Sequence, residues 1–154
     1  MATRGSEAYL SDIKKSQVGI TSGCNQAFSA SISMLCAEGD EVILPTPFYF
    51  NHKMWLDMAG IKTVMLQCTG GMVPDPKDAA SLINDRTRAI VLVSPNNPCG
   101  VEYPSDVITA FYELAQTFKI ALVIDETSRD FYSLDEMPHQ IFQNAKWEEP
   151  LIHL

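Results

Sequence analysis

The chain has 154 residues, which is enough for one domain with a buried core. Hydrophobic residues make up 46% of it and charged residues 19%, a balance that is typical of globular proteins and excludes general disorder. The net charge is −8, and the basic residues form no cluster, so the sequence disfavours nucleic acid and anionic membranes as partners.

Targeting and redox signals point to the cytoplasm. No apolar run approaches the roughly 20 residues of a membrane span, and the N-terminus lacks the apolar stretch of a signal peptide. The four cysteines are widely spaced without a CxxC pair, and three histidines complete no zinc pattern. We therefore expect a cytoplasmic protein with reduced thiols and no metal.

Short β-branched runs alternate with longer helical patterns along the chain. In order, we expect a strand at 18–21, a helix at 25–36, a strand at 41–44, a helix at 52–59, a strand at 62–66, a helix at 75–82, a strand at 88–93, a helix at 105–118 and a strand at 120–124. Strands that are apolar throughout and are followed by helices predict an α/β fold: a mainly parallel sheet with helices on both faces.

The sequence also suggests how the chain is organised. Residues 1–17 are assigned to an N-terminal segment and residues 18–154 to the α/β domain. Residues 151–154 have the pattern of another buried strand, which follows a turn at Pro150. Because a domain seldom stops where a strand begins, we expect the chain to be a piece of a longer protein.

Ligands of parallel α/β sheets bind at the carboxyl ends of the strands, so the segments that follow the expected strands are candidate sites. The first, Ser22-Gly23-Cys24-Asn25, leads into a helix whose first backbone N–H groups are unpaired and attract phosphate. The alternative is that Ser or Asn only caps the helix.

Three other strand ends hold candidate side chains. The ring of Tyr49 can stack on a flat cofactor, or it can pack in the core. His52 is either a hydrogen-bond relay or a structural group, and Asn97 either donates to a ligand oxygen or belongs to a rigid turn. Asp125 ends an apolar strand, where a carboxylate needs a partner or ligand unless it caps the following turn.

Taken together, four segments resemble the pyridoxal-phosphate-dependent aminotransferases of class I/II, which have fold type I. They are residues 20–27 (ITSGCNQA), 39–42 (GDEV), 94–100 (SPNNPCG) and 123–126 (VIDE). The resemblance runs from about Val18 to Asp130. It implies part of the large cofactor-binding domain, pyridoxal 5'-phosphate as cofactor, an amino acid and a 2-oxo acid as substrates, and a homodimer.

The resemblance also implies a role for each candidate. Backbone N–H groups of Gly23, Cys24 and Asn25 would hold the cofactor phosphate. Tyr49 would stack on the pyridine ring, and Asn97 would bind its 3′-oxygen. Asp125 would pair with the ring nitrogen and keep it protonated, which makes the ring a better electron sink, and His52 would support Asp125.

Two departures from the family pattern matter. Ser128 stands where many members have a tyrosine that contacts the 3′-oxygen, although Tyr132 could substitute for it. Lys146 is the only lysine after Asp125, and without a Ser/Thr-rich context it is interpreted as a surface residue rather than the Schiff-base lysine. We therefore expect truncation before that lysine and no transamination by the chain alone.

Three alternatives stay open from the sequence. The first is another fold-type-I enzyme, such as a lyase or decarboxylase, which would share the same cofactor residues. The second is a non-catalytic aminotransferase-like binding domain, although residues 1–17 contain no DNA-binding pattern. The third is an unrelated doubly wound domain that binds a phosphate compound.

Overall fold

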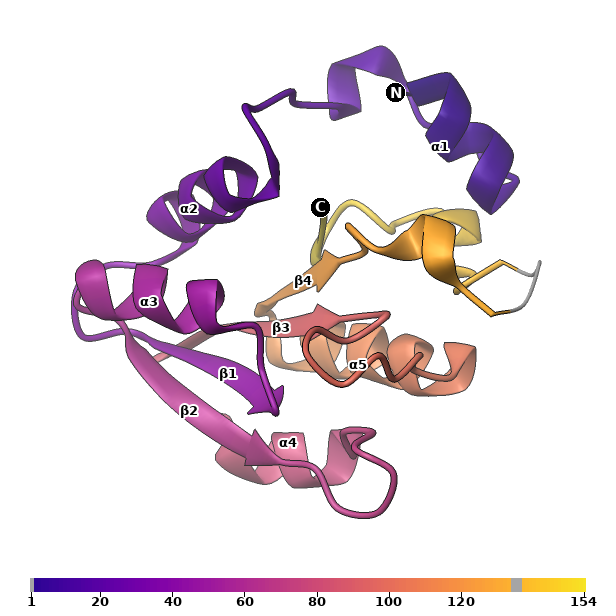
Figure 1. Cartoon of the computed structure of the whole chain (residues 1–154). Helices are drawn as coiled ribbons and strands as arrows, with labels where there is room; N and C mark the ends of the chain where they lie inside the picture. The colour runs from indigo at the N-terminus through magenta and orange to yellow at the C-terminus, as the bar shows by residue number, and fades with distance from the viewer. Residues whose placement is uncertain (1, 134–136) are drawn as a thin grey trace.

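A computed structural model describes residues 2–133 and 137–154 of the chain. Five parallel strands form a single sheet in the order β2-β1-β3-β4-β5 (Figure 1). The strands are β1 (Glu41–Thr46), β2 (Lys62–Gln67), β3 (Thr87–Val93), β4 (Ala121–Asp125) and β5 (Leu151–His153). The helices are α1 (Ala2–Tyr9), α2 (Cys24–Leu35), α3 (Phe50–Met58), α4 (Pro76–Leu82) and α5 (Ser105–Phe118), with short 3-10 turns η1 (Lys15–Gln17), η2 (Arg129–Phe131) and η3 (Ile141–Gln143).

Helices cover both faces of the sheet, as predicted. On one face, Phe28 of α2 and Leu56 of α3 pack with Val123 of β4. On the other, Phe111 of α5 packs with residues that include Ile124, the next residue of β4. This alternation follows from the strand geometry, in which successive side chains point to opposite faces. The prediction of a parallel α/β sheet is confirmed.

Local sequence signals explain where several elements begin and end. Asp75 caps α4 by accepting a hydrogen bond from the Lys77 backbone N–H (2.8 Å), and Pro76 occupies the first helical position. Helix α5 spans the predicted range. Lys119 directly after it adopts the left-handed backbone conformation (φ 55°), which ends the helix. The remaining helix and strand boundaries lie within a few residues of those predicted.

The strand predicted at 18–21 is wrong. These residues form neither helix nor strand, and the Ile20 side chain is 80% exposed. The run has the β-branched composition of a strand, but none of the five described strands pairs with it. It instead leads along the surface into α2 (Figure 1).

Helix α1 was not predicted. Its Tyr9 is 1% exposed and packs in the core on the α5 side of the sheet, so part of the segment 1–17 contacts the α/β domain closely. The predicted start of a strand near residue 151 is confirmed by β5, which pairs with β4.

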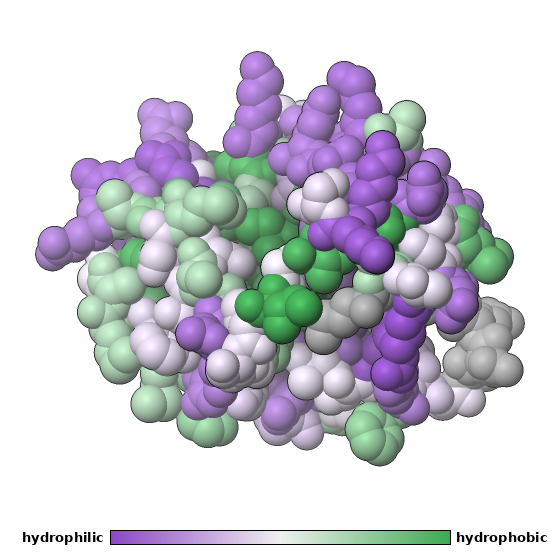
Figure 2. Space-filling view, turned by 90° about the horizontal axis from the view of Figure 1, so that it is seen from above, coloured by the Kyte–Doolittle hydropathy of each residue, from purple (hydrophilic) through white to green (hydrophobic). Residues whose placement is uncertain are grey.

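Several large hydrophobic side chains are exposed on the described surface. Figure 2 shows such residues among hydrophilic ones on the face seen from above. Leu10, Ile20 and Phe131 are the most exposed of the large hydrophobic side chains. Among the described helices, none combines the length and apolarity needed to cross a membrane.

Candidate cofactor site

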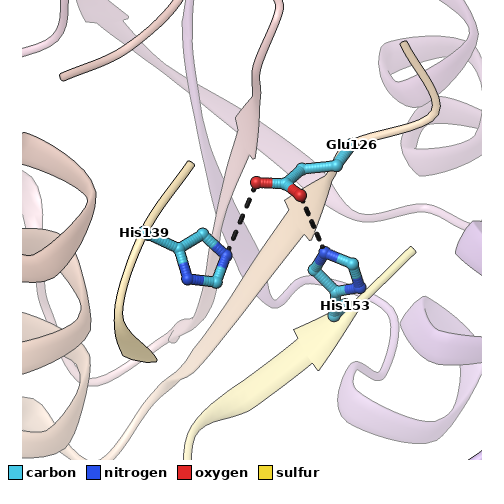
Figure 3. A group of neighbouring side chains, drawn as sticks. All are labelled: Glu126, His139 and His153. Carbon is cyan, nitrogen blue, oxygen red and sulfur yellow. Dashed lines mark hydrogen bonds and ion pairs between the residues drawn. The ribbon is translucent and has the colours of Figure 1, made fainter. Parts of the chain in front are cut away.

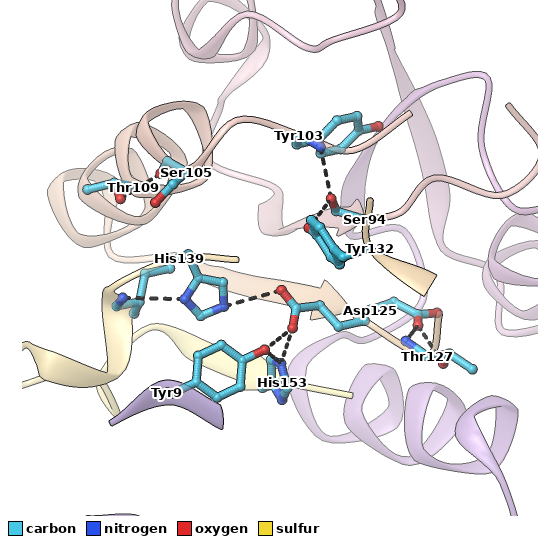
Figure 4. A network of polar contacts seen from close by, with 12 residues as sticks. Tyr9, Ser94, Tyr103, Ser105, Thr109, Asp125, Thr127, Tyr132, His139 and His153 are labelled. Atoms are coloured by element: carbon cyan, nitrogen blue, oxygen red, sulfur yellow. Dashed lines mark hydrogen bonds and ion pairs between the residues drawn. The ribbon is translucent and has the colours of Figure 1, made fainter. Parts of the chain in front are cut away.

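Asp125 lies at the carboxyl end of β4 with its side chain almost fully buried. Its Oδ1 accepts hydrogen bonds from the backbone N–H (3.0 Å) and the hydroxyl (2.7 Å) of Thr127, which follows it (Figure 4). Its Oδ2 lies 3.1 Å from Nε2 of His52, and the two side chains are 5% and 1% exposed. A carboxylate is therefore held at the sheet edge by groups from the turn after β4 and from α3.

The surroundings of Asp125 favour its charged form. Burial alone would raise the pKa of the carboxyl, but the contact with His52 and the hydrogen bonds from Thr127 outweigh it and hold the pKa below the ordinary value. Asp125 is therefore an anion at neutral pH, as a partner for a protonated ring nitrogen must be.

Aromatic side chains fix the orientation of His52. Its ring stacks on Phe28 of α2, with centroids 4.1 Å apart, and the ring of Tyr49 meets it edge-on at 5.2 Å. The Tyr49 hydroxyl accepts a hydrogen bond from the Asn51 side chain (2.9 Å). Residues from α2, α3 and the preceding turn thus hold His52 against Asp125.

The start of α2 lies beside the same carboxylate. Burial raises the pKa of the Cys24 thiol, Thr127 opposes the rise in part, and the charge of the neighbouring Asp125 adds to it. Gly23 immediately before the helix has φ 99° and ψ 164°, a conformation that glycine adopts readily. The predicted phosphate segment therefore adjoins Asp125.

Backbone groups at this helix start are available to a ligand. The first N–H groups of an α-helix have no intrahelical partner. The N–H of Ser22 is already taken, since it donates to the Gln26 side chain (2.6 Å). The first backbone bond of the helix comes from Ala27, so Gly23, Cys24 and Asn25, the three residues predicted from the sequence, are among the residues whose N–H groups a ligand could use.

Asn96 anchors the loop after β3, which also carries Asn97, the predicted ligand of the 3′-oxygen. Buried Asn96 donates to the Pro47 carbonyl (3.2 Å) and to the Tyr103 hydroxyl (3.1 Å). Asn97 is exposed on this loop. Asn96 therefore ties the loop to the turn after β1 and leaves the neighbouring Asn97 side chain at the surface.

Ser128 and Tyr132 follow Asp125, and the structure gives them different surroundings. Ser128 is half-buried. Among the described residues, no side-chain hydrogen bond connects Asp125 with Ser128, and none connects it with Asn25 or Asn97. The Tyr132 hydroxyl lies 2.7 Å from Oγ of Ser94, which also accepts from the Tyr103 N–H (2.9 Å; Figure 4). Tyr132 thus already has a protein partner.

Lys146 is a surface residue, as expected. Its side chain is 72% exposed and pairs with Glu149 (3.2 Å). It precedes β5, and because β5 runs parallel to β4, it lies toward the edge opposite Asp125. A cleft of about 640 Å³ also lies at that opposite edge, next to Thr87, Lys119 and Ala121, and none of the predicted site residues lines it.

A second polar cluster was missed by the sequence reasoning. Glu126, His139 and His153 come together on the other face of the sheet (Figure 3). The Tyr9 hydroxyl joins them and donates to Glu126. Their sequence separations of 13 and 14 residues match no short motif. The one available signal was strand alternation, which turns Glu126 away from Asp125.

Comparison with known proteins agrees with this architecture. Residues 2–152 match the family described as aminotransferase class I and II. The chain is 32% identical over 111 residues to alanine aminotransferase of Mycobacterium tuberculosis, covering 71% of this chain and 26% of the relative. It is 36% identical over 109 residues to aspartate/prephenate aminotransferase of Thermus thermophilus, covering 70% and 28%.

Solved structures give the same result. Aspartate aminotransferase from Thermus thermophilus with maleate superposes with a TM-score of 0.88 at 28% identity, covering 99% of this chain and 40% of that one. Alanine aminotransferase from Pyrococcus furiosus gives 0.86 at 25% identity, covering 93% and 37%. The chain thus spans well under half the length of these proteins, and it belongs to the aminotransferase class I and II family.

Proposed function

We propose that this chain forms the cofactor-binding face of a pyridoxal-phosphate-dependent aminotransferase, which moves an amino group between an amino acid and a 2-oxo acid. The observation that supports this most directly is the buried Asp125–His52 pair at the end of β4, beside the start of α2. The two substrates and a homodimer are proposed with it, from the family.

The donor set at this edge fits the cofactor. Asp125 is a buried anion, suited to a protonated pyridine nitrogen, and the N–H groups at the start of α2 suit a phosphate. When bound, the cofactor supplies an electron sink for the negative charge left as a substrate loses its α-proton. In this proposal Asp125 keeps the ring nitrogen protonated, while Tyr49 and Asn97 hold the ring face and its 3′-oxygen.

His52 acts through Asp125 in this proposal. Stacking on Phe28 keeps its ring in place, so Nε2 stays 3.1 Å from the carboxylate. The Thr127 bonds hold the other carboxylate oxygen. Asp125 is thereby fixed before the cofactor arrives, which lowers the cost of ordering it on binding.

Lys146, the only lysine that follows Asp125 in the chain, is not placed to anchor the cofactor covalently. Lys146 is exposed toward the opposite edge, so the lysine required for catalysis would have to be supplied from elsewhere. We therefore propose that the chain alone binds pyridoxal phosphate without a covalent bond and transaminates nothing.

The test is a titration of the purified chain with pyridoxal phosphate, followed by absorbance. Asp125→Asn should weaken binding by about tenfold or more, because a hydrogen bond to a charged group contributes about 1.5–3 kcal/mol. Asp57→Asn, which removes a surface carboxylate paired only with Lys53, is the matched control and should bind as the unaltered chain does. Equal affinity of all three proteins would refute the role of Asp125.

Two further measurements test whether the chain lacks a lysine that binds the cofactor covalently. After borohydride treatment, mass spectrometry should find no cofactor attached specifically to one lysine. A panel of amino donors and oxo acids should give no turnover. An enzyme-like rate from this chain would overturn the proposal that it is inactive alone.

A further inference from the structure

We propose that Glu126, His139 and His153 form a binding site for a divalent transition metal of the zinc type. They come from three segments: Glu126 directly follows β4, His139 precedes η3, and His153 ends β5. One ligand atom from each lies within 4.8 Å of the others. This departs from the prediction of no metal, which considered only spacing along the chain.

Two buried atoms of the cluster lack hydrogen-bond partners. Oε1 of Glu126 and Nε2 of His139 are both unsatisfied among the described residues, although their side chains are 1% and 0% exposed. They face each other at 3.5 Å (Figure 3). Leaving buried polar atoms unpaired is costly, and a cation between them would give both a partner.

The third ligand and its neighbour complete the arrangement. Nε2 of His153 lies 3.1 Å from the other Glu126 oxygen, and the Tyr9 hydroxyl donates to that same oxygen. A hydrogen bond of this kind orients the carboxylate in many metal sites. His153 is 22% exposed, which gives an ion a path from solvent.

Ligand chemistry selects the class of metal. Two imidazole nitrogens with one carboxylate oxygen suit Zn²⁺, Co²⁺ or Ni²⁺, whereas Mg²⁺ and Ca²⁺ prefer oxygen ligands. Metal–ligand bonds of about 2.0–2.2 Å in a tetrahedral site would place the ligand atoms about 3.4 Å from one another. The most widely separated of the three ligand atoms, which lie within 4.8 Å of one another, must therefore approach by up to about 1.4 Å.

Binding also requires a change at His139. Its Nδ1 accepts a long hydrogen bond from the Ile141 backbone N–H (3.3 Å), so the neutral ring carries its proton on Nε2, toward Glu126. Ligation through Nε2 needs that proton to leave Nε2, and the Ile141 bond must then break or the ring must turn over. The Ile141 amide is thus a local reporter of metal binding.

The experiment is a titration of the purified chain with Co²⁺ and Zn²⁺ after alkylation of its free thiols. One Co²⁺ per chain should give visible absorption bands, Mg²⁺ should not compete, and the Ile141 amide signal should shift. Glu126→Gln and His153→Asn should each weaken binding at least tenfold. Glu113→Gln, which neutralises an exposed carboxylate of α5, is the matched control for Glu126→Gln and should leave metal affinity unchanged.

Folding of the variants is checked by circular dichroism, and the unaltered chain gives an independent readout. Zn²⁺ at a hundredfold excess over its dissociation constant should raise Tm by about 5–10 °C, reversibly with a chelator. The proposal is overturned if the unaltered chain binds no stoichiometric Co²⁺, or if the Glu126 and His153 variants bind as well as it does. Neither result depends on pyridoxal phosphate.

Discussion

Asp125 and Glu126 are adjacent in sequence, yet their carboxylates lie on opposite faces of the sheet. Each carboxylate contacts a histidine side chain. Asp125 is 3.1 Å from His52 on the α2 and α3 side, and Glu126 is 3.1 Å from His153 on the α5 side. The separation follows from the alternation of side chains along β4. Substitutions at the two positions should therefore have separable effects.

Removing the nitrogen atoms of His52 should destabilise the fold. His52→Phe retains a ring that can stack on Phe28, but it leaves the buried Asp125 carboxylate without one partner. Breaking a buried pair in this way typically costs about 3–5 kcal/mol, to be measured by urea unfolding.

A second variant separates charge from packing at this pair. Asp125→Asn in the His52→Phe background should recover part of the lost stability, because a neutral amide is cheaper to bury than a lone carboxylate. If His52→Phe stays within 1 kcal/mol of the unaltered chain, or if the double variant recovers nothing, the pair does not hold Asp125 as described.

The sheet could be predicted because its signals are local. Four strands are apolar runs between helical patterns, and the Asp75-Pro76 pair marks a helix start. The run 18–21 has the same composition, but its strand state would have required a pairing partner, which local sequence does not encode. Helix α1 was missed because its stability comes from Tyr9 packing in a distant core.

The candidate site also has a part that the sequence predicts and a part that depends on tertiary contacts. The prediction that Cys24, His52 and Asp125 lie together is supported by their contacts, because the strand-end rule brings distant segments to one edge. Asn97 and Ser128 stay predictions as cofactor contacts, since no side-chain hydrogen bond among the described residues joins either of them to Asp125. The Glu126 cluster depends on tertiary placement of three segments, which spacing alone does not encode.

Glu41 should make stability depend on acid pH. The hydrogen bond from Lys62 (2.8 Å), followed by that from Asn84 (2.8 Å), holds the pKa of this buried carboxyl below its ordinary value. Its contribution is therefore complete above the unfolded-state pKa and is lost as pH falls through the folded-state value.

Glu41→Gln should accordingly cost about 1–2 kcal/mol at pH 7, and the difference from the unaltered chain should shrink below about pH 4. Urea unfolding across this pH range measures it. Glu113→Gln, at an exposed position of α5, is the control and should stay within about 0.5 kcal/mol. A difference for Glu41→Gln that grows on acidification would contradict the assignment.

Tyr132→Phe tests whether Tyr132 substitutes for the tyrosine that many family members have at the position of Ser128. Because its hydroxyl already bonds Ser94, its loss should cost about 0.5–1.5 kcal/mol of stability and leave pyridoxal phosphate affinity unchanged. Ser94→Ala should cost a similar amount, and the double variant should cost less than the sum. A tenfold loss of cofactor affinity in Tyr132→Phe would instead make Tyr132 a cofactor contact.

Gly23→Ala should affect both stability and anion binding. At φ 99° and ψ 164° an alanine is strained by about 1–3 kcal/mol, although its Cβ would meet no atom within 4 Å. Gly19→Ala is the matched control, since that position is also open and has no positive φ, and it should change stability by less than about 0.5 kcal/mol. Relaxation of the strained turn should move the first N–H groups of α2 and weaken pyridoxal phosphate binding in Gly23→Ala alone. Equal unfolding midpoints and equal cofactor affinities for the two variants would show that the Gly23 conformation matters neither to the fold nor to the phosphate site.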